Sequence, residues 1–255
     1  MTPRMKIEII TLFPAYFDSV IGQSIIGRGR EKRLFEIEIV NLRDFATDRH
    51  KTTDDKPFGG GGGMVLMVEP LDKCLKALGH GAIAKEGERI VLTSAGGKVF
   101  DQPAAVEFSL LKRLTIICGH YLGVDERLLQ LYEIEEVSIG DYVLTGGEPA
   151  AAVMLDAVVR LIPGVLGNFE SALADSHVEE ILGTPVYTRP EEYDGIKVPE
   201  TLLGGNHGEI ENFRRREALK KTYMNRPELL DKIELSADER KYLDRLKDTD
   251  NNKNE

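Results

Sequence analysis

Short apolar runs that alternate with helix-like stretches constrain the fold of this chain more than any other feature. The runs, rich in Ile, Val and Leu, cover residues 6–12, 35–42, 89–94 and 113–119. Apolar residues recur at helical spacing between them, at residues 14–25, 69–78 and 102–111. Apolar strands that alternate with helices are typical of a parallel sheet with helices on its faces. The first part of the chain is therefore predicted to be an α/β domain with a mostly parallel sheet.

The character of the sequence changes after residue 163. Residues 148–162 are Ala-rich, with a Pro in the first turn, and predict a strong helix that ends at Pro163-Gly164. The segment that follows lacks a clear period, and later residues are helical, with a capping-box spacing from Ser236 to Glu239. The predicted organisation is a first domain over 1–163, a linker over 164–174, a smaller helical domain over 175–247 and a disordered tail over 248–255.

Composition excludes several classes of protein. No apolar stretch approaches the roughly 18 residues that span a bilayer, and the N-terminus becomes acidic before a signal-peptide core can form. Cys74 and Cys118 are too few for a disulfide framework and lie in apolar settings, which indicates reduced thiols. The five His residues are isolated and show no zinc spacing, so no structural metal site is expected. We expect a cytoplasmic protein without a membrane partner.

Charge leaves the question of a nucleic-acid partner open. The net charge of −10 argues against such a partner for the chain as a whole. However, Arg214, Arg215 and Arg216 form a basic cluster with Lys220 and Lys221, while acidic residues gather elsewhere. Any bound RNA would have to contact such a local patch.

Three glycine-containing motifs are candidates for a site. Gly59–Gly63 cannot lie inside a helix or strand without a large entropic cost, and it lacks the residues of a P-loop or a dinucleotide-binding fingerprint. It is either a substrate loop or a plain linker. Residues 138–148 could offer backbone groups to a planar base, or could simply turn between a strand and a helix. Residues 118–127 follow an apolar run, where α/β proteins place ligands.

Four polar residues of the chain each allow a functional and a structural interpretation. His120 could act as a base, although a lone His is more often structural, and Asp125 has the position of an N-cap. Arg160 ends an apolar helix, where a cation is also favoured by the helix dipole, and Asp175 lies in a region typical of a helix start. Residue type alone does not make either Arg160 or Asp175 catalytic.

Seven segments taken together closely resemble the bacterial tRNA (guanine-N1-)-methyltransferases that modify position 37, which belong to the SPOUT class. In order along the chain they are ITLFP, DRHKTTDDKPFGGG, CGHYLGVDER, SIGDYVLTGGE, RLIPGVLG, YTRPEEYDG and GNHGEIENFRRR. The resemblance implies an α/β fold with a trefoil knot and a smaller C-terminal helical domain. It also implies a homodimer that grips the tRNA anticodon stem-loop, preferring guanine at position 36.

The resemblance further implies roles for individual residues. S-adenosylmethionine would bind to three loops, at Leu92, Thr93, Ser94, Ala95, Gly119, Tyr121, Ser138, Ile139, Gly140, Tyr142, Leu144, Gly146 and Gly147. Asp175 would be the general base and Arg160 its electrostatic partner. Asp54, Gly63 and Ser171 would lie near the target guanine, and Arg215 would contact tRNA.

The sequence departs from the family pattern at Leu122, where the family usually has Glu in C-G-x-Y-E-G. This removes a carboxylate near the methionine end of the cofactor site, in a family that is associated with magnesium. Ala95 and Gly96 also replace the usual Pro-Gln, and Pro149 replaces the usual Leu. Two other readings remain open: a knotted methyltransferase for a different RNA, and a non-catalytic RNA-binding protein with the same fold.

Overall fold

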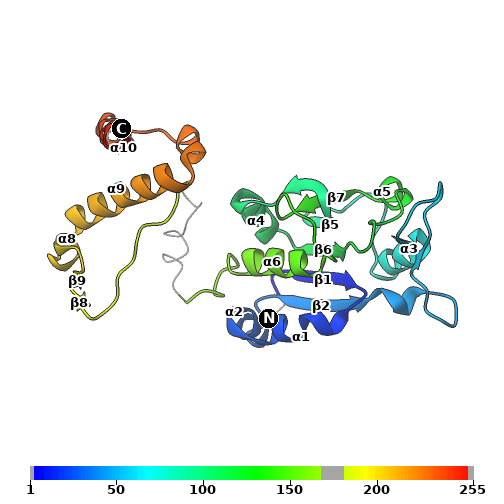
Figure 1. The fold of residues 1–255 in the computed structure, drawn as a ribbon. Helices are drawn as coiled ribbons and strands as arrows, with labels where there is room; N and C mark the ends of the chain where they lie inside the picture. Colours follow the sequence, from blue (N-terminus) through cyan, green and yellow to red (C-terminus); the bar gives the residue numbers. More distant parts are fainter. Residues whose placement is uncertain (1–2, 168–180, 252–255) are drawn as a thin grey trace. The chain divides into compact units, whose positions relative to one another are not determined.

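The computed structural model describes residues 3–167 and 181–251 (Figure 1). The chain divides into two compact units, residues 1–167 and residues 168–255. Asp175 and Ser171, which the resemblance places near the target base, lie outside the described residues, as does most of the predicted linker.

The first unit is organised around a five-stranded sheet in the order β2-β1-β6-β5-β7, in which all neighbouring strands are parallel (Figure 1). The strands are β1 (Lys6–Thr11), β2 (Glu36–Asn41), β5 (Glu88–Val99), β6 (Arg113–Cys118) and β7 (Ile134–Ser138). The predicted parallel sheet is confirmed, and four of its strands coincide with the four apolar runs. The central strands β1 and β6 are buried over nearly their full length, as apolar sequence on both faces requires.

Strand β7 was not predicted. Its sequence carries Glu135 and Glu136 in the middle, which masks the apolar character of a strand. Because β7 lies at the edge of the sheet, these side chains stay partly exposed, and Glu135 pairs with Arg89 of the adjacent β5 at 3.3 Å. Edge strands often carry charged residues, which discourage pairing with other chains.

Helices cover both faces of the sheet. Those of the first unit are η1 (Pro14–Phe17), α1 (Asp18–Gly22), α2 (Ser24–Glu31), η2 (Leu42–Phe45), α3 (Val68–Ala77), α4 (Gln102–Ser109), α5 (Arg127–Leu131) and α6 (Glu148–Val159). One hydrophobic cluster joins the sheet to α2, α4 and α6, and a second joins it to α3 and α5. A two-stranded antiparallel pair, β3 (Asp54–Asp55) and β4 (Val65–Leu66), lies at the base of the glycine run.

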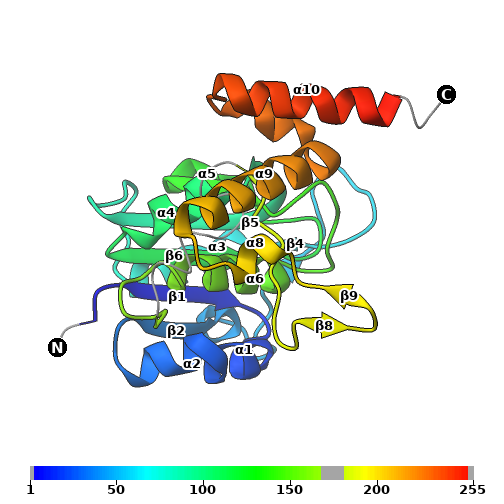
Figure 2. The same ribbon diagram turned by 90° about the vertical axis from the view of Figure 1, so that its left-hand side faces the viewer.

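The second unit is mainly helical (Figure 2). Its described elements are the hairpin β8 (Glu192–Tyr193) and β9 (Ile196–Lys197), followed by α8 (Glu200–Leu203), α9 (His207–Asn225), η3 (Pro227–Lys232) and α10 (Ala237–Asn251). The predicted capping box is confirmed, because Ser236 and Glu239 each accept the backbone N–H of the other, at 3.3 and 2.8 Å. Helix α10 continues to Asn251, so it includes the first residues of the range 248–255 that was expected to be disordered.

Candidate functional site

A cleft of about 480 Å³ lies at the carboxyl ends of β5, β6 and β7. Its walls come from three segments, residues 92–96, 119–124 and 136–147. Loops that follow neighbouring parallel strands meet at one edge of the sheet, which is where open α/β folds place ligands. All thirteen residues that the resemblance assigns to the cofactor line this one cleft. Segments far apart in the sequence therefore converge on a single site.

The first wall begins at an irregularity in β5. The pairing of β5 with β7 shifts register between Thr93 and Lys98, so that residues 94–97 bulge from the strand. A Cβ atom on Gly97 would lie only 2.4 Å from the backbone of Glu136 and Val137. Glycine is therefore required where the strand re-joins its neighbour, and the bulge makes Ser94 to Gly96 available to line the cleft.

The three walls are joined to one another at Thr93. The Gly119 N–H donates to the Thr93 hydroxyl at 3.0 Å, and the Gly147 N–H donates to the Gly119 carbonyl at 2.7 Å. A Cβ atom on Gly147 would lie 1.9 Å from the Thr93 Oγ1. The glycines in these motifs thus allow close backbone approach, and residues 139–147 form bends between β7 and α6.

A buried polar group at the edge of the cleft was not predicted. Glu148, at the start of α6, is almost fully buried and accepts a hydrogen bond from the Thr11 hydroxyl at 2.7 Å. An added Cβ on Gly146 would lie 2.5 Å from Glu148 Oε2 and 2.6 Å from His120 Nδ1, so both polar atoms face the Gly146 backbone. Within the described part of the chain, His120 Nδ1 is buried and has no hydrogen-bond partner.

His120 and Cys118 also have surroundings that limit their chemistry. The His120 ring packs against the rings of Phe13 and Tyr121, with centroids 5.3 and 4.3 Å away. This aromatic packing supports the structural reading of His120. Burial raises the pKa of the Cys118 thiol well above its usual value, and the nearby Glu148 carboxylate acts in the same direction. Cys118 is therefore unsuited to act as a nucleophile.

The glycine run adjoins the cleft through its last residue. An added Cβ on Gly63 would lie 3.0 Å from the side chain of Leu122, which lines the cleft. The Leu122 N–H also donates to the Met64 carbonyl at 3.1 Å. Asp54, in β3, pairs with Leu66 of β4 and does not line the cleft. Asp54 and Gly63 are the two residues predicted near the target guanine that the structure describes, and of these Gly63 contacts the cleft wall.

Two further predicted residues, Arg160 and Arg215, lie on helices of different units. Arg160 is the C-cap of α6, at the opposite end of that helix from Gly147. Arg215, in α9, forms an ion pair with Glu239 of α10 at 2.7 Å and so helps to join these two helices. The sequence showed the basic cluster but not this partner, which is 24 residues away.

The structure also describes the surroundings of Asp125 and the distribution of side chains that could bind a metal ion. The N-cap of α5 is Glu126 and not Asp125 as predicted, although the Asp125 carboxylate accepts the backbone N–H of Arg127, the first residue of the helix, at 3.0 Å. Within residues 3–167 and 181–251, no group of three or more His, Cys, Asp or Glu side chains is placed to hold a metal ion. No helix in the same ranges has both the length and the apolar composition needed to cross a membrane.

Comparison with known proteins identifies what this chain is similar to. A family model described as tRNA (Guanine-1)-methyltransferase TrmD matches residues 5–232. The tRNA (guanine-N(1)-)-methyltransferase of Geotalea uraniireducens is 50% identical over 242 residues, covering 95% of this chain and 97% of that protein. Proteins of the same name from Geobacter metallireducens and Bacillus cereus are 50% and 46% identical, over 94% and 96% of this chain and 96% and 99% of the relatives.

Proposed function

We propose a specific reaction for this chain, which belongs to the tRNA (guanine-1)-methyltransferase family. It methylates N1 of the guanine at position 37 of tRNA and prefers guanine at position 36. The methyl donor is S-adenosylmethionine. The main support comes from the thirteen residues that were predicted to bind the cofactor. They belong to three separate segments of the chain, and all of them line one cleft. A chance similarity of motifs would not predict that convergence.

The cleft has the chemistry that this donor needs. Its volume of about 480 Å³ falls within the range of about 300–1,000 Å³ typical of small-molecule sites. The glycine-rich walls present backbone N–H and C=O groups that suit the edge of an adenine ring, and Leu92, Ile139 and Leu144 supply apolar surface. Bound there, S-adenosylmethionine would supply a methyl group on a positively charged sulfur. The proposal also includes the trefoil knot of the SPOUT class, within the first unit.

Asp175 is the proposed general base. N1 of guanine holds a proton at neutral pH and is a poor nucleophile until that proton leaves. A carboxylate of ordinary pKa, about 4, is a weak base, so removal needs help from groups that stabilise charge on the base. Arg160 and the backbone near Gly63 are proposed to stabilise the charge that spreads to O6. Positioning of the two reactants would provide much of the remaining rate.

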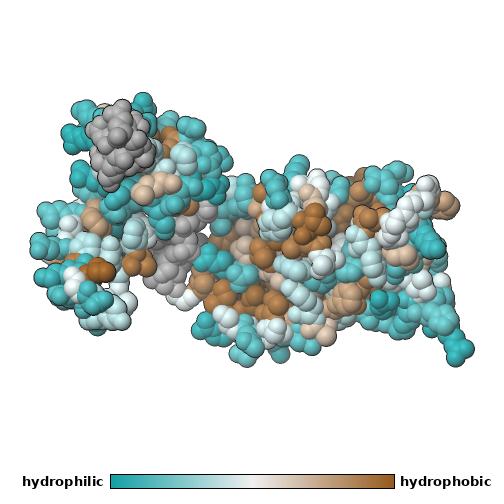
Figure 3. All heavy atoms as spheres, in the orientation of Figure 1, coloured by the Kyte–Doolittle hydropathy of each residue, from teal (hydrophilic) through white to brown (hydrophobic). Residues whose placement is uncertain are grey.

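A second copy of the chain is proposed to complete the site. Arg160 follows a 12-residue helix that starts beside Gly147, and such a helix is about 18 Å long, so Arg160 is distant from the cleft of its own chain. A homodimer could bring Arg160 of one protomer to the cleft of the other. Apolar side chains are exposed on the first unit around α4 and α6, including Val106, Leu110 and Val153 (Figure 3). Such surface suits a subunit interface.

The second unit is proposed to bind the tRNA anticodon stem-loop, in the cytoplasm. Arg214 and Lys221 lie seven residues apart on α9, and both are exposed. Residues seven apart share one helix face, so these two cations can contact neighbouring phosphates. Arg215 would contribute mainly by holding α9 against α10 through Glu239.

Methyl transfer to defined transcripts tests the function. The protein is incubated with labelled S-adenosylmethionine and two tRNA transcripts that both carry guanine at 37 and differ only in whether guanine occupies position 36. We expect transfer to N1 of guanine 37, faster when position 36 is guanine. Transfer to another RNA position would favour a different knotted methyltransferase, and no transfer to either transcript would favour a non-catalytic RNA-binding protein.

Asp175→Ala tests the proposed base. We expect transfer to fall by roughly 10²–10⁴-fold, because a positioned general base contributes about that much. Binding of S-adenosylmethionine, measured by calorimetry, should remain as in the unmodified protein. Asp231→Ala, which removes an exposed carboxylate from η3, is the control and should keep full activity. Loss of cofactor binding in Asp175→Ala would instead assign Asp175 a structural role.

A further inference from the structure

Phe58, at the start of the glycine run, is more exposed than any other large apolar residue that the structure describes. Its side chain is 99% exposed, and Gly59 to Gly62 after it are also free of packing, since an added Cβ at any of them would meet no atom within 4 Å. An aromatic ring fully in water contributes nothing to the core and would be more stable against an apolar surface. The fold of this chain therefore does not explain why Phe stands at position 58.

The base of this loop is hydrogen-bonded to the wall of the cleft. Residues 56–64 connect β3 to β4, and β4 runs alongside residues 122–125. The Leu66 N–H donates to the Gly123 carbonyl at 3.0 Å, and the Asp125 N–H donates to the Leu66 carbonyl at 2.9 Å. Since residues 122–124 line the cleft, the loop that carries Phe58 ends at the rim of the methyl-donor site.

Leu122 fixes the last glycine of the loop against that rim. The Leu122 side chain lies directly over Gly63, where an added Cβ would approach its Cγ and Cδ1 to 3.0 and 3.1 Å. Gly63 also has a φ of +96°, which a residue with a side chain adopts only with strain. The loop is thus anchored at Gly63 and free of contacts from Gly59 to Gly62.

The anchored length limits how far Phe58 can lie from the cleft. Phe58 and Gly63 are five positions apart, and a chain spans at most about 3.6 Å per residue, so Phe58 remains within about 18 Å of the Leu122 contact. Figure 1 shows this loop projecting from the end of the first unit that carries α3 and α5. The ring is therefore held close to the cleft but outside it.

We propose that Phe58 stacks on a nucleobase of the RNA loop whose guanine enters the cleft, and so positions that loop for methylation. This inference rests on the proposed function. A base that is taken out of a stack leaves the face of its neighbour uncovered, and an aromatic side chain can cover that face. Phe has no hydrogen-bonding group, so Phe58 acts as a positioning residue that does not select among bases. The class of ligand is a nucleobase in single-stranded RNA.

Three variants test this role. Phe58→Ala removes the ring, Phe58→Trp keeps an aromatic face, and Ile83→Ala removes an apolar side chain that is 78% exposed on a different loop. Because none of these side chains is buried, all three proteins should fold normally. Base–aromatic stacking corresponds to roughly a 5- to 150-fold change in affinity, so we expect the KM for tRNA in Phe58→Ala to rise within that range. Phe58→Trp and Ile83→Ala should keep the original KM, and all three should bind S-adenosylmethionine normally.

A fluorescence measurement reports stacking without methyl transfer. A tRNA transcript with 2-aminopurine at position 38, beside the target, is titrated with each protein in the presence of S-adenosylhomocysteine. We expect quenching with the unmodified protein and Phe58→Trp, and weaker quenching with Phe58→Ala. If the unmodified protein methylates tRNA but Phe58→Ala matches it in both KM and quenching, this inference is wrong. If the unmodified protein transfers no methyl group, the proposed function itself is wrong.

Discussion

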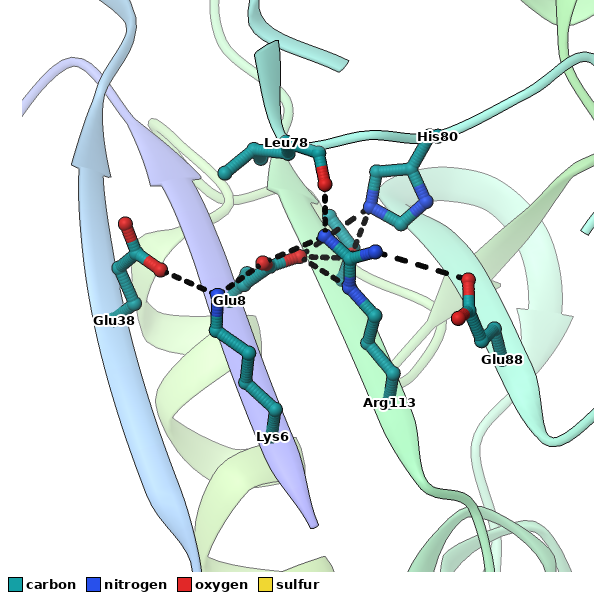
Figure 4. A network of polar contacts seen from close by, with 8 residues as sticks. Lys6, Glu8, Glu38, Leu78, His80, Glu88 and Arg113 are labelled. Atoms are coloured by element: carbon teal, nitrogen blue, oxygen red, sulfur yellow. Dashed lines mark hydrogen bonds and ion pairs between the residues drawn. The ribbon is translucent and has the colours of Figure 1, made fainter. Parts of the chain in front are cut away.

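The two ends of the parallel sheet differ in what they bury. At the amino ends of β1 and β6, charged side chains are buried in a network around Glu8, which is 0% exposed (Figure 4). At the carboxyl ends, the strands lead into glycines whose backbones touch, and these glycines let the walls of the cleft approach one another closely. Side chains hold one end together, whereas the absence of side chains shapes the other.

The network at the amino ends satisfies nearly all the bonding capacity of one carboxylate. Glu8 accepts from Arg113 Nε at 3.0 Å and Nη2 at 2.8 Å, and from the Thr115 hydroxyl at 2.7 Å. Burial alone would raise the pKa of the Glu8 carboxyl, but the hydrogen bonds that it accepts, first from His80 and then from Arg113, outweigh burial and hold the pKa well below its usual range. The carboxylate therefore stays ionised and ties β1 to β6.

This contrast predicts that substitutions at the amino ends change stability while those at the carboxyl ends change binding. One end of a parallel sheet can therefore serve stability while the other end of the same strands serves binding. The charged network joins residues that are 105 positions apart in sequence, from Glu8 to Arg113, without contributing to the cleft.

Glu8→Ala should be the most destabilising change. It leaves the Arg113 guanidinium, only 14% exposed, without its main partner, and breaking a buried ion pair in this way costs about 3–5 kcal/mol. Chemical denaturation measures this loss. Under conditions where the variant is still folded, its affinity for S-adenosylmethionine should match that of the unmodified protein. A large loss of cofactor affinity in the folded variant would show that the two ends are not independent.

Acid titration with Glu8→Gln separates the charge of Glu8 from its shape. Because the pKa of Glu8 is lowered on folding, its charge stabilises the protein above the unfolded pKa of about 4.3, and this stabilisation disappears as the pH falls through the folded pKa. The unmodified protein should therefore exceed Glu8→Gln in stability at pH 7, and the difference should shrink below about pH 4. A difference that is constant with pH would assign the effect to shape alone.

Gly147→Ala should have a smaller effect on stability and a clear effect on binding. The new Cβ would lie 1.9 Å from Thr93 Oγ1 and 2.7 Å from the Gly119 nitrogen, so the walls of the cleft must separate. Overpacking of this kind typically costs about 1–3 kcal/mol, and we expect affinity for S-adenosylmethionine to fall by about tenfold or more. Calorimetry measures the affinity.

Gly22→Ala is the matched control for Gly147→Ala. A Cβ on Gly22 would meet no atom within 4 Å, and Gly22 lies in α1, outside the cleft. This variant should bind the cofactor as the unmodified protein does. Equal binding by Gly147→Ala and Gly22→Ala would mean that close backbone contact between the walls is not needed.

The two ends of the sheet also differ in how well the sequence predicted them. Apolar runs predicted four of the strands, and glycines that interrupt apolar sequence indicated the loops of the cleft, because both signals are local. Glu8 lies between isoleucines in an alternating run, where it looks like a residue on a solvated face. Its partners are distant in sequence, as Glu239 is for Arg215, and no local pattern indicates such pairs.

The close contact at Gly147 could not be predicted for the same reason. Its requirement for glycine comes from Thr93 and Gly119, which approach it only after the strands have paired. The assignment of residues 138–147 to a cofactor came from family resemblance, because the residues alone also fitted a simple turn between a strand and a helix. Edge strand β7 was missed because its two glutamates are tolerated at a sheet edge but hide the apolar pattern.

Lys6→Ala should have the smallest effect, although Lys6 belongs to the same network. Lys6 pairs with Glu8 at 2.8 Å and with Glu38 at 2.7 Å, but its side chain is 36% exposed and Glu38 is more exposed still. Water can replace such a partner, and exposed ion pairs contribute about 0–1 kcal/mol. We therefore expect chemical denaturation to detect a loss no larger than that of Lys73→Ala, the control, which removes an exposed pair with Glu69.

The size of the Lys6 effect decides whether the network acts as separate pairs or as one unit. After Lys6 is removed, Glu8 still accepts from Arg113 and Thr115, so the buried carboxylate remains satisfied. If stability instead falls by as much as in Glu8→Ala, the exposed rim of the network must be coupled to its buried centre. The amino ends of the sheet would then behave as a single electrostatic unit. Membership of the network, and not burial of the side chain, would then decide which residues stabilise the protein and which serve binding at the carboxyl ends.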